Sequence, residues 1–417
     1  MSTILAYGAP ALGHLLPMSA LLRELAARGH EIHLRTLESG VAEGNRLGFR
    51  TKAVDPRIEE ITSTDWTARG VFGVLKMTLD VLCRRAECEI DDLERAVAEV
   101  RPDALIIDAN CWGAMSAADA GEIPWAVFSP FTPFLRSAGM PPVGPGMRPR
   151  SDLIGAVRDL GAWAVVWQVM DRRVLPRLNA VRAAVGAPAV RSVDEFVRRA
   201  PLMLVVGGEP FEYPHPDWGD SVHLIGACVS DPEPDDVPPW LAEIESPIVL
   251  VTTSSIKQAD AILGTTALEA LADDPVHMVV TFPAGIPEGL SVPPNATVHQ
   301  FVPHGAVLDR AVCAVTHGGM GATVRALAQS VPVCVVPFGR DQYEVAMRVK
   351  VAGCGTRLPA DDLTRARLRA KVREAMTMTE GARRVAAGFT ATGGVARGAD
   401  LIEERILSRF RRSGTAV

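Results

Sequence analysis

The sequence predicts an α/β protein of two domains, each a parallel β-sheet covered by helices, with a deep cleft between them. Three observations predict this fold: a length of 417 residues, strand–helix alternation in both halves, and a proline- and acid-rich stretch between the halves. A chain of this length exceeds one ordinary hydrophobic core. We place the first domain at 1–215, the linker at 216–240, the second domain at 241–395, and a C-terminal helix that returns to the first domain at 396–417.

The first half alternates short apolar runs with segments of helical periodicity. We predict helices at Leu15–Ala27 and Ile90–Val100, and strands at Ile4–Tyr7, Glu31–Arg35, Ala104–Ile107, Trp125–Phe128 and Leu202–Val206. Alternation of this kind predicts a parallel sheet with helices on both faces. The prolines between residues 209 and 240 exclude a helix or a central strand there, which is why the linker is placed in that stretch.

The same alternation resumes in the second half. We predict a helix at Ala261–Leu271 and strands at Ile248–Thr252, His277–Thr281, Thr297–Phe301 and Pro332–Phe338. In each domain the parallel strands end at one edge of the sheet, and ligands bind at such edges. Two facing domains therefore predict a binding cleft between the carboxyl ends of their strands.

The most informative motif is His-Gly-Gly at residues 317–319. It follows an apolar run that ends at Thr316, and a helical pattern opens directly after it, near Met320 and Gly321. The free N–H groups and the dipole at a helix N-terminus stabilise a phosphate, and the imidazole adds another donor. An ordinary glycine turn between a strand and a helix is the alternative interpretation.

Two further loops in the second half carry polar side chains that can reach the same ligand. Asp341 and Gln342 follow the strand at 332–338 and can bind hydroxyl groups, although Asp341 alone could simply cap the next helix. Ser255 follows the strand at 248–252 and can reach a phosphate, although loop serines are usually only solvated. A phosphate site beside a hydroxyl-binding pair predicts a ligand in which a sugar is attached to a phosphate.

His14 and Asp108 form the candidate acid–base pair. Each follows an apolar strand of the first domain, so both are expected at the same edge of that sheet. A carboxylate bonded to one ring nitrogen fixes the tautomer of a histidine and raises the basicity of the other nitrogen. The alternatives are a histidine that lines a helix start and an aspartate that caps the helix near Trp112.

Composition and missing motifs exclude several classes of protein. A net charge of −6 argues against a nucleic-acid partner. Seven scattered cysteines without metal-like spacing indicate reduced thiols in a cytoplasmic protein. Glycine and proline break the N-terminal apolar run, so we expect no signal peptide, and no apolar stretch reaches the ~20 residues of a membrane span. The sequence lacks an Asp-x-Asp metal pair, a Gly-x-Ser-x-Gly nucleophile and a dinucleotide fingerprint.

Nearly the whole chain resembles one known family. The run HGGMGATVRALAQSVPVCVVPFGRDQYEVAMRV is similar to the nucleotide-sugar signature of the family 1, or UDP-glycosyltransferase-like, glycosyltransferases. Other similar segments, in chain order, are GHLLPMSALLRELAARGHEI, PDALIIDANCWGAMSAADAGEIPW, FEYPHPDWGDSVHLIGA and VHQFVPHGAVL. The resemblance, closest to the bacterial natural-product type, implies the GT-B fold. In that fold two Rossmann-like domains face each other, the first binding the acceptor and the second binding the nucleotide-sugar.

The resemblance also implies roles for individual residues. His14 corresponds to the general base and Asp108 to the carboxylate that orients it. The implied donor-binding residues are Ser255, Phe301, Val302, His317, Gly319, Met320, Gly321, Thr323, Asp341 and Gln342. No metal and no cofactor is expected beyond the nucleotide diphosphate sugar, a co-substrate. Donors at a helix N-terminus and an imidazole would then neutralise the diphosphate in place of Mg²⁺.

One departure from the family pattern bears on the nucleotide. Residue 325 is Arg, where the family often has a Glu that bridges the ribose hydroxyls. A TDP-sugar has no ribose 2′-OH and would lose less without that acceptor. We therefore expect TDP-sugars to be preferred over UDP-sugars.

Apolar side chains of the first half predict a hydrophobic acceptor, such as a polyketide or other natural product. The candidates are Trp66, Phe72, Met77, Trp112, Phe131, Phe134 and Trp163. For any single one of them, a place in the hydrophobic core is the alternative.

We expect an enzyme that transfers a sugar, with inversion, to a hydroxyl or a nitrogen of a hydrophobic small molecule. Two alternatives stay open on the sequence alone: a nucleotide-sugar-binding partner protein without catalysis, and a nucleotide-sugar epimerase of the same fold. A dehydrogenase is disfavoured because the glycine fingerprint is missing. We expect a monomer or a homodimer.

Overall fold

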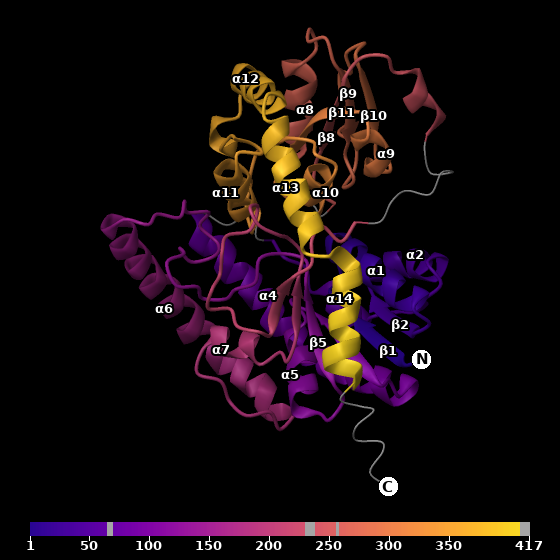
Figure 1. Cartoon of the computed structure of the whole chain (residues 1–417), viewed down its shortest axis with the longest axis vertical. Helices are drawn as coiled ribbons and strands as arrows, with labels where there is room; N and C mark the ends of the chain where they lie inside the picture. Colours follow the sequence, from indigo (N-terminus) through magenta and orange to yellow (C-terminus); the bar gives the residue numbers. More distant parts are fainter. Residues whose placement is uncertain (65–69, 230–237, 256–257, 409–417) are drawn as a thin grey trace.

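The computed structural model describes residues 1–64, 70–229, 238–255 and 258–408, and it contains two α/β units, one above the other in Figure 1. The sheet of the first unit is parallel throughout, in the order β3-β2-β1-β4-β5-β6-β7. Its strands are β1 (Thr3–Tyr7), β2 (Glu31–Thr36), β3 (Arg50–Ala53), β4 (Ala104–Asp108), β5 (Trp125–Ser129), β6 (Met203–Val205) and β7 (Val222–Leu224). Its helices are α1 (Leu12–Ala27), α2 (Val41–Arg46), α3 (Pro56–Glu60), α4 (Gly70–Val100), α5 (Trp112–Ala120), α6 (Leu153–Ala184) and α7 (Val193–Arg198).

The second unit repeats this architecture with a parallel sheet in the order β10-β9-β8-β11-β12-β13. Its strands are β8 (Ile248–Thr252), β9 (His277–Thr281), β10 (Ala296–His299), β11 (Ala311–Thr316), β12 (Val333–Val335) and β13 (Gly355–Arg357). Its helices are α8 (Ala261–Ala270), α9 (His304–Leu308), α10 (Met320–Ala328), α11 (Gln342–Ala352), α12 (Arg365–Met376) and α13 (Thr379–Ala391). The chain then forms α14 (Gly394–Ile402) and a π-helical turn, Glu403–Leu407. The predicted α/β fold of two facing domains is confirmed.

The hydrophobic core runs through both units. Strands β4, β5 and β8 are buried along their whole length, as expected of central parallel strands covered on both faces. One continuous cluster of buried side chains contains Leu21 and Leu204 of the first unit together with Val324 and Phe389 of the second. Separate clusters fill the other face of each sheet. The two units are therefore joined by apolar packing as well as by polar contacts.

Several elements differ in extent from those the sequence predicted. The helix predicted at Ile90–Val100 is only the last part of α4. The edge strand β3, the short strand β7 and the long helix α6 were not predicted, because β3 and β7 are short and α6 lacks a clean apolar face. Strand β12 ends at Val335, two residues before Pro337, which cannot donate to a sheet ladder.

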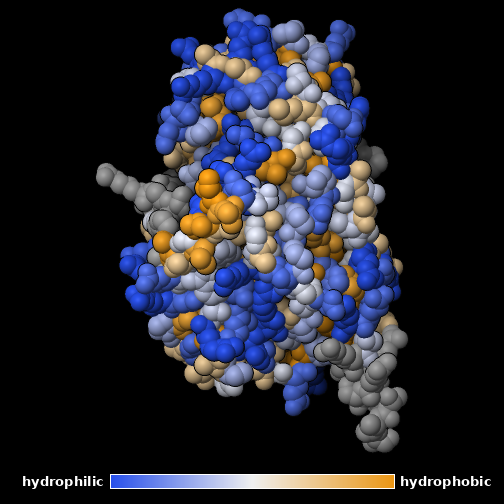
Figure 2. All heavy atoms as spheres, turned by 60° about the vertical axis from the view of Figure 1, so that its left-hand side comes forward, coloured by the Kyte–Doolittle hydropathy of each residue, from blue (hydrophilic) through white to orange (hydrophobic). Residues whose placement is uncertain are grey.

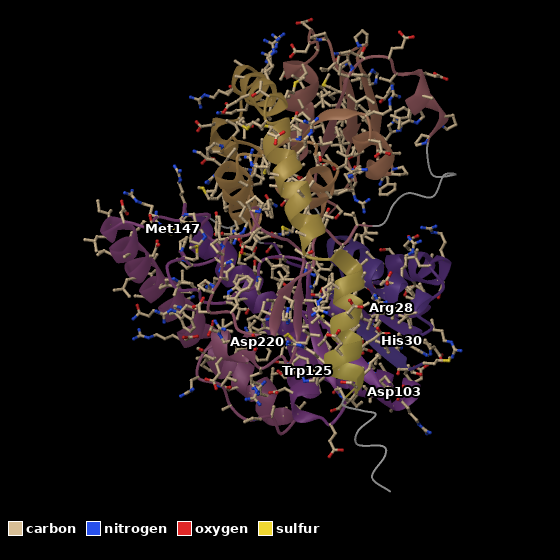
Figure 3. All side chains as sticks on the ribbon, viewed as in Figure 1. Arg28, His30, Asp103, Trp125, Met147 and Asp220 are labelled. Atoms are coloured by element: carbon tan, nitrogen blue, oxygen red, sulfur yellow. The ribbon has the colours of Figure 1, made fainter. Side chains whose placement is uncertain are left out.

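The C-terminal helices connect the two units. Helix α13 packs against α10 of the second unit, and α14 packs against α1 of the first. The chain turns between them at Gly393 and Gly394, whose φ angles of 82° and 62° favour glycine. Arg28 lies beside α14 in Figure 3 and bonds Asp400 at 2.7 Å and Glu403 at 2.8 Å. The end of the chain is thereby held on the first unit.

A buried cluster of charged side chains joins α11 to loops of the first unit. Arg348 of α11 contacts the Glu212 carboxylate through Nε at 2.9 Å and Nη2 at 2.8 Å, and its Nη1 contacts Glu344 at 2.7 Å. The other oxygen of Glu344 accepts the backbone N–H groups of Gly144 and Gly146. All three charged side chains are almost fully buried.

Glu212 is held as a carboxylate by this cluster. Burial by itself would raise the pKa of Glu212, but Arg348, with His215 and Thr132, brings that pKa down to about 2. The guanidinium of Arg348 also lies 4.5 Å from the centre of the Tyr213 ring. The pairing of the Glu212 carboxylate with Arg348 therefore fixes α11 on the first unit.

Helix α6 carries several exposed apolar side chains. Leu153, Ile154, Val157 and Leu160 are each more than half exposed, and Figure 2 shows hydrophobic side chains gathered on the side of the molecule that carries α6. Within the described ranges, no single helix is both long and apolar enough to cross a membrane. The bent pair formed by residues Leu153–Gln168 and Asp171–Ala184, at 45°, meets those criteria of length and composition together.

We expect the Arg348→Met variant to lose about 3–5 kcal/mol of unfolding free energy, because it leaves the buried carboxyls of Glu212 and Glu344 without their cationic partner. Urea denaturation followed by circular dichroism measures the loss. The matched control is Arg367→Met, which breaks an exposed pair with Asp362 and should cost less than about 1 kcal/mol. Similar losses in both variants would show that the buried cluster stabilises the protein no more than an exposed ion pair does.

Candidate functional site

The candidate residues gather where the strand order of each sheet reverses. In the first sheet this point lies between β1 and β4, and in the second between β8 and β11. His14 and Asp108 follow or end the first pair of strands, and Ser255 and His317 follow the second pair. Ligands of open α/β sheets bind outside the carboxyl ends of the strands at such switch points. The topology therefore puts these residues at the expected place in each unit.

His14 and Asp108 are brought into direct contact. His14 Nδ1 lies 2.8 Å from Asp108 Oδ2, and the carboxylate is completely buried. The other oxygen, Oδ1, accepts the backbone N–H of Asn110 at 2.9 Å. Because both oxygens are committed, the carboxylate is fixed and His14 carries its proton on Nδ1. Nε2 is thereby left as the basic nitrogen.

The surroundings of His14 strengthen it as a base. Burial lowers the pKa of His14, but the charge and hydrogen bond of Asp108, with a further contribution from the charge of Asp341, raise it above its usual value. The side chain is 19% exposed, so it remains accessible. Asp341 belongs to the second unit, so the pKa of His14 depends on charges of both units.

His317 lies directly on the start of α10. Gly318 has a φ of +91°, and a Cβ there would come within 2.9 Å of Val335. A Cβ on Gly319, the N-cap residue of α10, would lie 2.5 Å from His317 Nε2. The two glycines are thus required for the turn and for the ring to reach the helix N-terminus, where an anion is stabilised. Burial is the main reason that the pKa of His317 is lowered.

Three other residues predicted to bind the nucleotide-sugar lie near this turn and differ in exposure. Thr323 is fully buried, and its hydroxyl lies 3.3 Å from that of Thr316, which accepts the Gly318 N–H at 3.1 Å. Met320 is also buried, whereas Gly321 is exposed in the first turn of the helix. Thr323 and Met320 therefore support the turn from below, and only the backbone of Gly321 faces outward.

Asp341 and Gln342 begin α11, but their side chains differ in availability. The Gln342 oxygen accepts the N–H groups of Phe338 at 2.8 Å and Gly339 at 3.1 Å, and its nitrogen donates to Gln258 at 3.0 Å. This amide organises its own loop. Asp341 is half-buried, and its burial raises the pKa of its carboxyl. Of the pair, Asp341 is the better placed to read a hydroxyl.

The residues predicted to bind the nucleotide also differ in exposure. Phe301 is 71% exposed and its ring is free to stack on a base, whereas Val302 is buried beneath it in the core. Ser255 is exposed at the end of the β8 loop. Arg325, in the last turn of α10, is half-buried, and its charge adds to burial in lowering the pKa of His304 to about 4.

Aromatic side chains extend from His14 into the first unit. The ring of Phe131 lies 5.8 Å from that of His14 and 6.2 Å from that of Phe134. Phe134 and Trp163 line a narrow apolar cavity of about 20 Å³, room for about one water molecule. Trp163 Nε1 donates to the Met140 carbonyl at 3.0 Å. These rings form a continuous apolar path beside the candidate base.

Not all predicted acceptor residues lie on this path. Trp112 is 2% exposed and packs edge-on against Phe196, so its assignment to the acceptor site was wrong: the ring fills the core behind β4. Met77 is half-buried on α4. Trp66 and the side chain of Phe72 lie outside the described residues.

Sequence reasoning missed Asp260 and Gln258. Asp260 is buried and accepts the Ser254 N–H at 2.6 Å and the Gln258 amide at 3.0 Å, and its Oδ2 lies 3.9 Å from His317 Nδ1. The only sequence signal was an aspartate just before a helix, which is typical of a cap. Across the part of the chain that the structure describes, no group of three or more His, Cys, Asp or Glu side chains could hold a metal ion.

Comparison with known proteins gives a consistent result. A family model described as "Erythromycin biosynthesis protein CIII-like, C-terminal domain" matches residues 265–395. The chain is 31% identical over 382 residues to 4'-demethylrebeccamycin synthase of Lentzea aerocolonigenes, covering 87% of this chain and 89% of that protein. It is 26% identical over 423 residues to demethyllactenocin mycarosyltransferase of Streptomyces fradiae, and the match covers 94% of this chain and 84% of that protein. The solved glycotransferase of kitacinnamycin matches with a TM-score of 0.74 at 27% identity, over 97% of this chain and 99% of that one.

We expect NMR titration of the histidine ring protons to give His14 a pKa above the usual 6.5. The Asp108→Asn variant should lower that pKa, because it removes the charge that stabilises the imidazolium while burial remains. His14→Ala assigns the signal. Asp103→Asn is the control, because Asp103 bonds the Thr3 backbone instead. An unchanged His14 pKa in Asp108→Asn would contradict the pairing.

Proposed function

The chain belongs to the family 1 glycosyltransferases of natural-product biosynthesis, and from this premise we propose that it moves a sugar from a TDP-sugar to a hydrophobic small molecule. The proposed acceptor atom is a hydroxyl oxygen, with a nitrogen as the alternative, and the sugar carbon is inverted. The observation that carries the proposal is the His14–Asp108 pair at the switch point of the first sheet, with His317 at the switch point of the second.

His14 acts as the general base. Its Nε2 takes the proton of the acceptor hydroxyl while the oxygen attacks C1 of the sugar from the face opposite the diphosphate. The bond between C1 and the diphosphate oxygen breaks as the new C1–O bond forms. Asp108 stabilises the resulting imidazolium through the 2.8 Å contact to Nδ1. A positioned base of this kind contributes about 10²–10⁴-fold to the rate.

The start of α10 receives the leaving diphosphate. Its free N–H groups, the helix dipole and the imidazole of His317 lie together on the Gly319 side of the turn. Preorganised donors of this type stabilise developing negative charge. We propose that they act without a metal ion and without any cofactor other than the nucleotide-sugar.

The acceptor lies against the apolar path of Phe131 and Phe134. Phe131 is adjacent to the His14 ring, so a flat or macrocyclic apolar molecule on this path would present a hydroxyl to the base. Asp341, half-buried at the start of α11 on the other unit, is proposed to bind sugar hydroxyls. Phe301, which is exposed at the end of the β10 loop, stacks on the thymine.

We expect His14→Ala to lose about 10²–10⁴-fold in turnover while still binding TDP. Products from a panel of TDP-sugars and aromatic or macrocyclic acceptors are measured by mass spectrometry in buffer with EDTA. The control is His277→Ala, since His277 begins β9 at the opposite end of its strand from the site. Full activity in His14→Ala would overturn its role as base, and loss of wild-type activity in EDTA would overturn the metal-free mechanism.

We expect TDP-glucose to exceed UDP-glucose in kcat/KM by about tenfold or more, the equivalent of roughly 1.4 kcal/mol. The reason is that Arg325 stands where a carboxylate would accept the ribose hydroxyls. Arg325→Glu should therefore raise the relative use of UDP-glucose, and Arg365→Glu on the exposed face of α12 serves as the matched control. A clear preference of the wild type for UDP-glucose would contradict the predicted preference for TDP-sugars.

A further inference from the structure

We propose that Asp260 is a positioning residue that holds His317 as an imidazolium when the diphosphate of the donor or product is bound. The proposal rests on the donor site proposed above and adds a residue to it. Asp260 does not touch the ligand. It acts through His317, and through that ring it makes the charge of the diphosphate site depend on its occupant.

His317 and Asp260 lie just beyond hydrogen-bond distance of each other. His317 Nδ1 lies 3.9 Å from Asp260 Oδ2. The histidine is 8% exposed and the aspartate 3% exposed. Among the described residues Nδ1 has no hydrogen-bond partner. A shift of about 1 Å would bring the two atoms to ordinary hydrogen-bond distance.

Asp260 is fixed toward the ring by other groups. Its Oδ2 accepts the Ser254 N–H at 2.6 Å and the Gln258 amide at 3.0 Å. Gln258 in turn accepts from Gln342, which begins α11. Although Asp260 occupies the N-cap position of α8, its side chain makes no capping hydrogen bond there. Helix capping therefore does not explain why this carboxylate is buried beside a histidine.

Proton positions decide what His317 can do for a phosphate. Its Nε2 edge lies on Gly319, at the start of α10. If a neutral ring carried its proton on Nδ1 toward Asp260, the lone pair of Nε2 would face the phosphate oxygens. Only the doubly protonated ring donates to both the carboxylate and the phosphate. The anionic ligand and Asp260 thus favour the same protonation state.

The groups around His317 keep it neutral until the ligand arrives. Burial lowers the pKa of His317 and the charge of Arg340 lowers it further, while the charge of Asp260 and the Thr252 carbonyl oppose this. A diphosphate adds negative charge on the Nε2 side and raises that pKa. Binding near neutral or higher pH therefore takes one proton from solvent onto the ring, and no other bond changes.

The test is calorimetric titration of the full-length protein with TDP and with UDP at pH 6 and pH 8, in two buffers of different ionisation enthalpy. At pH 8 we expect the wild type to take up close to one proton per nucleotide. In Asp260→Asn we expect binding about tenfold weaker at pH 8, the equivalent of one pKa unit. At pH 6, where the ring protonates more easily, the loss should be below about threefold, and proton uptake at pH 8 should largely disappear.

Matched variants separate positioning from general damage. Asp274→Asn removes another buried carboxylate of the same unit, one that bonds Arg369 and Arg373, and should leave nucleotide binding unchanged. In a His317→Gln background, Asp260→Asn should cause no further loss, because its effect passes through the ring. His317→Gln alone should abolish the proton uptake, which tests the inference even if Asp260→Asn does not fold.

An equal loss at both pH values, an equal loss in the His317→Gln background, or proton uptake that persists in His317→Gln would overturn the inference. Tighter binding of UDP than of TDP by the wild type would overturn only the donor preference, since either diphosphate reports on Asp260. A wild type that binds neither nucleotide would overturn the donor site and this inference together.

Discussion

The buried contact between Arg348 and Glu212 is the constraint on which the arrangement of the two units depends. Each half of the chain can form its own parallel sheet, and neither sheet contains both parts of the site. Arg348 lies on α11, directly after the loop that carries Asp341, and Glu212 lies in the loop that leads out of β6. Charges buried in this way are costly unless every group is paired. The cluster therefore favours one relative placement of the units.

That placement decides which chemistry is possible. His14 and Asp108 belong to the first unit, but the charge of Asp341 from the second unit contributes to the raised pKa of His14. Helix α14 supports the same placement from the other side through Arg28 and its carboxylate partners. These contacts hold the proposed base on one unit and the proposed anion site on the other in one arrangement.

The sequence predicted what depends on local pattern and failed where tertiary packing decides. Glycines at a strand–helix turn and a histidine after the first strand carry local signals, and the structure places both His14 and His317 beyond the carboxyl ends of strands, as those signals indicated. Trp112 was misplaced because an aromatic residue at a helix start has the same pattern whether it lines a pocket or fills the core. Asp260 was missed because its partner, His317, lies 57 positions further along the chain. A pattern of neighbouring residues cannot reveal a contact between positions so far apart in the sequence.

The two histidines of the candidate site differ in their contact with a carboxylate, and the roles proposed for them account for the difference. His14 is in full contact with its carboxylate at 2.8 Å, and its pKa is raised before any ligand binds. His317 stands 3.9 Å from its carboxylate, and burial keeps its pKa low. A base must be ready to accept a proton from the acceptor, so a finished hydrogen bond suits it. A group that must meet a diphosphate gains from remaining neutral until the negative charge arrives, because a buried imidazolium without that charge would destabilise the empty site.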